Sequence, residues 1–137
     1  MVTVALQGRT GNNLFQYAVG RHLAIRLGVD LELDVSFSGK DFDQVRQIMR
    51  LPIKAAIVRR FGSLKKISAR VMRREAYWLH RGEVFKMRPP STTFHPEVLD
   101  MPNGSLLVGY FQNPLYFHEI EDEIRDEFSL DEIGLNS

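Results

Sequence analysis

The chain has 137 residues, of which 44% are hydrophobic and 26% are charged. This amount of apolar side chain suffices for one modest core, so we expect a single globular domain. There are no cysteines, which excludes a disulfide framework and a thiolate metal site. No apolar stretch has the length of a membrane span, and the first apolar run is too short for a signal peptide, so we expect a cytoplasmic protein.

The net charge of +1 conceals an uneven distribution of charge along the chain. Lysine and arginine outnumber aspartate and glutamate by 14 to 4 over residues 40–90, whereas acids outnumber bases by 10 to 1 over residues 91–137. A basic middle region indicates either an anionic partner or neutralisation by the acidic region on the folded surface. The sequence leaves both alternatives open.

The N-terminal region predicts a strand followed by a helix. Val2–Leu6 is short, β-branched and apolar, which is typical of a strand buried on both faces. We expect a helix from Asn13 to Leu27, with Asn12 or Asn13 as its cap and Gly28 as its C-terminal stop.

A second strand is predicted at residues 29–35, where apolar and acidic residues alternate. This alternation favours a strand with one polar face. Strand, helix and strand in this order form a βαβ unit, in which the two strands are parallel. We therefore expect an α/β fold with a Rossmann-like parallel sheet flanked by helices.

The middle of the chain has weaker patterns. A helix that begins near Asp43 would end before Pro52. Ile57–Phe61 and Leu64–Leu79 are compatible with basic amphipathic helices. His95–Leu99 predicts a short helical turn, and Pro102–Gly104 a tight turn.

Clear patterning returns near the C-terminus. Ser105–Phe111 predicts another strand that, like Val2–Leu6, is buried on both faces. Asn113 suits an N-cap and Pro114 the first position of a helix, where its missing N–H costs nothing. The apolar stripe that follows, Phe117 to Phe128, predicts that this helix is continuous.

The turn between the first strand and the first helix, Gly8–Asn13, combines residues suited to an anion. Gly8 and Gly11 carry no Cβ, so a ligand can approach their backbone closely. The helix N-terminus offers unpaired N–H groups, and Arg9 adds a guanidinium. The simpler interpretation is a tight turn with a capping asparagine. The spacing does not match a dinucleotide-binding or P-loop fingerprint.

Two stretches resemble a known enzyme family. Gly8–Ala18 reads GRTGNNLFQYA and resembles the G-G-L-G-N-Q-hydrophobic-F-Q-Y-A opening of the glycosyltransferase family 11 α-1,2-fucosyltransferases. Gly109–Phe117 reads GYFQNPLYF and resembles that family's G-Y-[FW]-Q-S-E-K-Y-F. Residues 29–34 and 94–99 are also similar to family stretches. Arg9 departs from the family pattern and instead resembles the G-R-F-G-N-Q turn of protein O-fucosyltransferases.

The resemblance implies a role in fucose transfer. It implies that residues 1–137 form the N-terminal, acceptor-side, Rossmann-like domain of a GT-B glycosyltransferase. In that family a C-terminal domain with an H-x-R-R-x-D motif holds GDP-fucose, and this motif is absent from the chain. We therefore expect the chain alone to transfer no fucose. The reaction it implies is inverting, with GDP-fucose and a glycan as substrates and with neither a cofactor nor a metal. The substrate-binding residues it implies are Gly8, Arg9, Gly11, Asn12, Asn13, Tyr110 and Gln112, and the catalytic base stays unassigned.

An alternative function is a non-catalytic binding module. The basic residues Lys65, Lys66, Arg70, Arg73 and Arg74 would then meet an anionic membrane surface or a partner, such as a missing domain or a second subunit. Nucleic acid is not expected, because aromatic residues are not interleaved with this cluster in a binding motif. The four histidines show no metal-ligand spacing.

Overall fold

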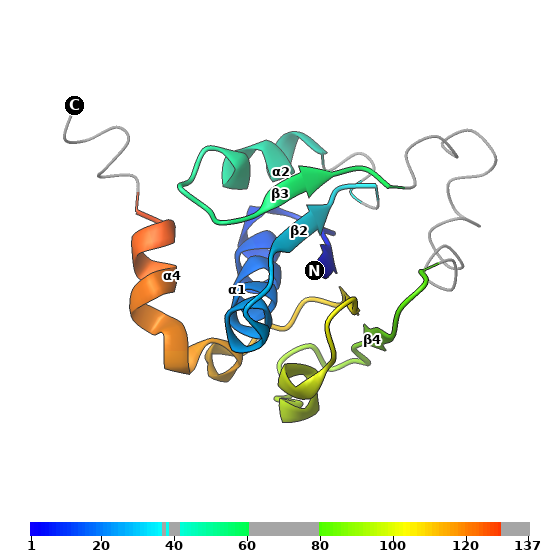
Figure 1. The fold of residues 1–137 in the computed structure, drawn as a ribbon. Coiled ribbons are helices and arrows are strands. Elements are labelled where there is room, and N and C mark those ends of the chain that lie inside the picture. The colour runs from blue at the N-terminus through cyan, green and yellow to red at the C-terminus, as the bar shows by residue number, and fades with distance from the viewer. Residues whose placement is uncertain (37, 39–41, 61–79, 130–137) are drawn as a thin grey trace.

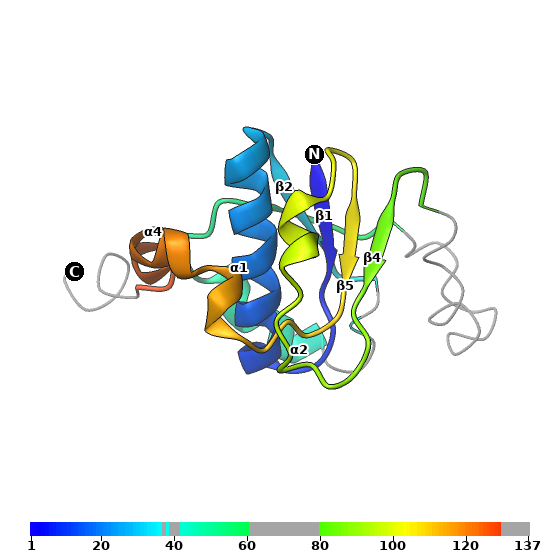
Figure 2. The ribbon, with the colours of Figure 1, turned by 90° about the horizontal axis from the view of Figure 1, so that it is seen from below.

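The computed structural model describes residues 1–36, 38, 42–60 and 80–129. Its centre is a five-stranded sheet in which every pair of neighbouring strands is parallel. The strands are β1 (Val2–Ala5), β2 (Leu31–Asp34), β3 (Ala56–Val58), β4 (Val84–Lys86) and β5 (Leu106–Val108). Their spatial order is β3-β2-β1-β5-β4 (Figures 1 and 2). The expected α/β fold with a parallel sheet is confirmed.

One face of the sheet is covered by α1 (Thr10–Leu27), which runs along β1 and β2 (Figure 2). The helix approaches closely at Gly20, where an added Cβ would lie 2.4 Å from Cγ2 of Val4 and 2.9 Å from Cδ1 of Leu31. Helix α2 (Phe42–Met49) and the short 3-10 helix η4 (Pro96–Asp100) pack against α1 in turn. The apolar core lies between this layer and the sheet.

The opposite face of β1 and β2 is polar but buried. Side chains alternate along a strand, so Thr3, Glu32 and Asp34 point away from α1. The predicted strand with one polar face is confirmed, and that face is buried: Glu32 is 2% exposed and Asp34 is fully buried. Glu32 is stable there because Thr3 and Arg60 bind its carboxylate.

Helix α1 begins earlier than predicted. Its first residue is Thr10 and its N-cap is Arg9, so Asn12 and Asn13 lie inside the first turn instead of capping it. Both asparagine side chains bind groups outside the helix, which explains why neither caps it. The predicted stop is confirmed, because Gly28 adopts a left-handed conformation with a φ of 67°.

The C-terminal region is not the single helix that its apolar stripe predicted. It consists of η5 (Pro114–Tyr116), η6 (His118–Ile120) and α4 (Glu121–Glu127). The amide of Ile120 donates to the Phe117 carbonyl at 3.0 Å, while the Tyr116 carbonyl is bound by the His22 ring at 2.7 Å. The predicted cap is confirmed, because the Asn113 side chain accepts from the Leu115 amide at 2.9 Å.

In the middle of the chain the predictions had mixed outcomes. Helix α2 ends before Pro52 and the helical turn after His95 is present as η4, as expected. The helix predicted from Ile57 is wrong, since Ile57 lies in β3, where it pairs with Leu33. The strand β4 was not predicted. The expected helix at residues 64–79 lies outside the described part of the chain. Among the described residues, no helix is long and apolar enough to cross a membrane.

A buried polar contact ties α4 to α1. The Tyr17 hydroxyl donates to the Glu127 carboxylate, which also pairs with Arg21 at 3.0 Å, and the Lys54 amide donates to the same hydroxyl at 2.9 Å. The pKa of Tyr17 is raised far above the ordinary value of a phenol. The larger cause is burial of the hydroxyl, and the second is its hydrogen bond to Glu127. The contact fixes the middle of α1 relative to the C-terminal segment.

Candidate functional site

The two motifs meet beyond the carboxyl ends of β1 and β5, which are neighbours in the sheet. Gly8, with a φ of 74°, forms the turn after β1. A Cβ at this position would lie 2.6 Å from Nδ2 of Asn12 and 3.2 Å from Cε1 of Tyr110. The turn of the first motif therefore packs directly on the aromatic ring of the second, and only glycine fits between them.

A direct hydrogen bond also joins the motifs. Nε2 of Gln112 donates to Oδ1 of Asn12 at 2.7 Å. The other end of the Gln112 amide accepts from the Ser91 hydroxyl at 2.5 Å, and the Gln112 main-chain amide donates to the Ser91 carbonyl at 2.9 Å. Gln112 is thus held at both ends, and it fixes the orientation of Asn12.

Beneath this surface a buried amide pair supports the turn. Nε2 of Gln16 donates to the Gly109 carbonyl at 2.9 Å, and its Oε1 accepts from the Gln7 amide at 3.2 Å and from Nδ2 of Asn13 at 3.1 Å. Asn13 also donates to the Gln7 carbonyl at 3.1 Å. Both side chains are fully buried. Asn13 therefore holds the turn in place from below, and its Oδ1 has no hydrogen-bond partner among the residues that the structure describes.

Gln16 was not among the predicted site residues, although it lies within the quoted motif. Its signal in the sequence is a polar residue on the apolar face of a helix, which indicates a buried hydrogen-bonding role. It is the residue that links the end of β1 to the end of β5 across the sheet.

Arg9 and Gly11 lie on the exposed rim of the site. The Arg9 guanidinium makes no hydrogen bond or ion pair with any residue that the structure describes, and it forms no cap on α1. A Cβ added at Gly11 would meet nothing within 4 Å. The site therefore presents an unpaired positive charge beside the positive end of an 18-residue helix.

Two large side chains of the second motif, Tyr110 beside Gly8 and Leu115 five residues later, are exposed. Tyr110 is 38% exposed and Leu115 is 52% exposed. Between them Phe111 is buried, with a positive φ of 49°, and its ring packs edge-on against Tyr116 at 5.4 Å. The buried packing of Phe111 holds the turn after β5 in the conformation that leaves Tyr110 at the surface.

Of the predicted residues, the structure brings Gly8, Asn12, Tyr110 and Gln112 into contact and leaves Arg9 and Gly11 open on the rim. Asn13 lies underneath. Among the described residues, no group of three histidine, aspartate or glutamate side chains is placed to hold a metal ion. The basic cluster of the alternative function, Lys65 to Arg74, lies outside the described ranges.

Comparison of the chain with protein-family models, with curated proteins and with solved structures found no match. The resemblance to the fucosyltransferases therefore rests on the motifs themselves.

Proposed function

We propose that this chain is the acceptor-side, Rossmann-like domain of an inverting glycosyltransferase of the α-1,2-fucosyltransferase type, the N-terminal half of a GT-B enzyme. Its substrates would be GDP-fucose and a glycan hydroxyl. The observation that carries the proposal is the contact between the two family-like motifs, through the Asn12–Gln112 hydrogen bond and the packing of Gly8 on Tyr110. Residues about 100 positions apart in the sequence thus form one surface at the edge where parallel α/β sheets bind ligands.

The chemistry of the rim suits the leaving group of such a reaction. When an acceptor hydroxyl attacks the anomeric carbon, negative charge develops on the departing diphosphate. Preorganised positive groups stabilise that charge. The Arg9 guanidinium can bind phosphate oxygens with two parallel N–H groups, and the N-terminus of α1 adds main-chain amides.

The remaining residues would position these groups and the acceptor. Gln112 and Asn12 hold one another, and Asn13 and Gln16 fix the turn that carries Arg9. The exposed ring of Tyr110 offers an apolar surface with a polar tip, which suits the mixed surface of a sugar. The resemblance assigns most of the donor contacts to a second domain with the H-x-R-R-x-D motif, so we expect weak GDP binding by this chain.

Calorimetric titration with GDP and with guanosine tests the proposal. We expect GDP to bind more tightly than guanosine, because the diphosphate meets Arg9. Substitution Arg9→Gln should weaken GDP binding by roughly tenfold or more, since it removes a charge-assisted contact. Arg50→Gln is the matched control, because Arg50 is exposed and its side chain makes no hydrogen bond or ion pair in the described part of the chain.

Two results would count against this role. One is equal binding of GDP and guanosine, and the other is an equal loss of affinity in Arg9→Gln and Arg50→Gln.

A further inference from the structure

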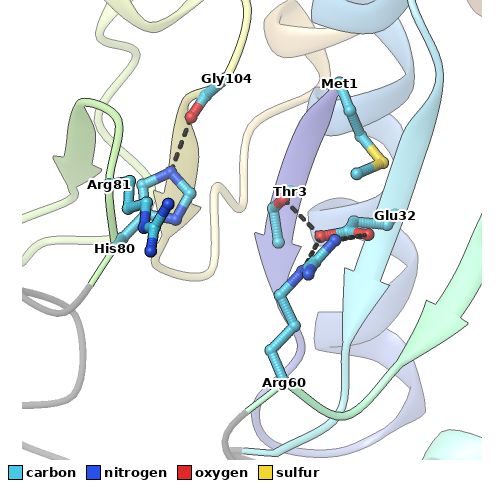
Figure 3. A pocket seen from close by; sticks show the side chains of 7 residues that line it. All are labelled: Met1, Thr3, Glu32, Arg60, His80, Arg81 and Gly104. Carbon is cyan, nitrogen blue, oxygen red and sulfur yellow. Dashed lines mark hydrogen bonds and ion pairs between the residues drawn. The ribbon is translucent and has the colours of Figure 1, made fainter.

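A cavity lies on the face of the sheet that points away from α1. Its volume is about 350 Å³, and its lining includes Thr3, Glu32, Arg60, His80, Arg81 and Gly104 (Figure 3). Thr3 and Glu32 are paired across β1 and β2, and Gly104 precedes β5. His80, Arg81 and Gly104 thus precede the amino ends of β4 and β5, while Arg60 follows β3 and reaches back over the sheet to Glu32. The turn at Gly8 instead follows the carboxyl end of β1.

The floor of this cavity is the ion pair of Glu32 and Arg60, in which the carboxylate already accepts hydrogen bonds at both oxygens. The Glu32 carboxylate accepts from the Thr3 hydroxyl at 2.9 Å and from Nε and Nη2 of Arg60 at 2.5 and 2.8 Å. Burial acts to raise the pKa of Glu32, but the hydrogen bonds from Arg60 and Thr3 outweigh it and hold the pKa below the ordinary value. Glu32 is thus ionised, and the positive charge of Arg60 balances its negative charge. The carboxylate therefore has little capacity left to attract a cation.

Arg60 keeps unused donors on the cavity side. Its side chain is 50% exposed, and only Nε and Nη2 are engaged by Glu32. An arginine has five N–H donors, so Nη1 can still bind an acceptor without disturbing the pair. The guanidinium is also held in one orientation by its two bonds to Glu32, which lowers the entropy cost of binding a ligand there.

The facing wall carries a second guanidinium. Nε2 of His80 is bound to the Gly104 carbonyl at 2.6 Å, and a Cβ added at Gly82 would lie 2.2 Å from the same carbonyl oxygen. These contacts hold the segment before β4 against the segment before β5. Arg81 lies on this wall, is exposed and forms no hydrogen bond or ion pair with the residues that the structure describes (Figure 3).

We propose that this cavity binds a small molecule through one phosphate or carboxylate group, held between Arg81 and the free Nη1 of Arg60. Among the described side chains that line the cavity, Glu32 and Arg60 cancel one another, so Arg81 gives these side chains a net positive charge. A volume of about 350 Å³ lies near the lower end of ligand pockets, which span about 300–1,000 Å³, so the ligand is small.

Titration with inorganic phosphate and, separately, with acetate, followed by amide proton–nitrogen NMR, tests this site. We expect saturable shifts at the amides of Thr3 and Gly104 with at least one of the two anions, and the tighter anion identifies the ligand group. Arg81→Gln should weaken binding roughly tenfold or more, because it removes a charged donor. Arg88→Gln carries the same charge change on an exposed residue that does not line the cavity, and it should leave the affinity nearly unchanged.

The double variant Glu32→Gln with Arg60→Gln removes the floor pair without leaving a buried charge alone. It should also weaken binding, and an unfolding curve would verify that it stays folded. The absence of saturable shifts in the unsubstituted chain, or equal losses in Arg81→Gln and Arg88→Gln, would overturn the site. Shifts at Gly11 and Asn12 report on the other edge of the sheet, so this result is separable from the proposed glycosyl transfer.

Discussion

Gly8 and Gly11 belong to the same motif but are constrained differently. Gly8 has a φ of 74° and lies against Asn12 and Tyr110, so its lack of a Cβ is required by the fold. Gly11 is helical, and a Cβ there would point into open space. The fold alone does not explain a glycine at position 11, because alanine is the better helix former. A ligand that approaches the backbone does explain it.

Substitution Gly11→Ala therefore separates folding from binding. It should raise the free energy of unfolding by about 0.4–1 kcal/mol, because alanine restricts the unfolded chain. It should also weaken GDP binding about fivefold or more, since the methyl group occupies the space where the ligand would lie. Urea unfolding and calorimetry measure the two effects on the same samples.

Gly8→Ala is the matched control for this experiment. It should lower the free energy of unfolding by about 1–3 kcal/mol, because alanine disfavours a positive φ and its Cβ meets Asn12. If Gly11→Ala instead leaves GDP affinity unchanged, the open space above Gly11 is not part of the binding site.

At the scale of elements, features that depend on a strong local pattern could be predicted from the sequence. The apolar run at β1, the glycine that ends α1 and the Asn113 cap each depend on neighbouring residues alone. The contact between the two motifs could be expected from the parallel sheet, because carboxyl ends of neighbouring strands share an edge. The packing of Gly8 on Tyr110 could not be derived from the patterns themselves.

Other elements depended on tertiary contacts that the patterns do not show. Strands β3 and β4 have three residues each, which is too few to show the alternation of apolar and polar residues that predicts a strand. The polar face of β2 could be predicted, but its burial could not, because Thr3 and Arg60, the partners of Glu32, are distant in the sequence. The C-terminal helix is interrupted at Phe117, next to the Tyr116 carbonyl that His22 binds from α1.

The Glu32–Arg60 pair predicts how stability depends on pH. Hydrogen bonds from Arg60 and Thr3 hold the pKa of Glu32 below its ordinary value in the folded chain, so its contribution to stability is present at neutral pH. The free energy of unfolding should fall as the pH drops through the ordinary range of a glutamate carboxyl group and below it, because the unfolded state takes up a proton first. Glu32→Gln should remove this part of the acid slope and cost about 1–3 kcal/mol at pH 7.

Urea unfolding between pH 3 and pH 7 measures this slope. Glu83→Gln is the control, because Glu83 is exposed and its carboxylate has no partner among the described residues. An acid slope that is unchanged in Glu32→Gln would show that the pair does not stabilise the link between β3 and β2.

At the scale of the whole molecule, charge and topology separate two binding surfaces. The acidic C-terminal region pairs with α1, through Glu127 with Arg21 and Asp100 with Arg26. This pairing leaves Arg9 unpaired at the carboxyl edge of the sheet and Arg81 unpaired on the far face, within the residues that the structure describes. The two guanidiniums serve different sites, and they can be tested independently.

The central claim is that the two motifs form one surface that meets the diphosphate of a nucleotide sugar. Amide proton–nitrogen NMR of the chain during titration with GDP tests this most directly. The claim predicts that Gly11, Asn12 and Tyr110 shift together with one dissociation constant, and that guanosine leaves these amides unmoved. Shifts confined to one motif, or shifts that appear only around Gly104, would contradict it.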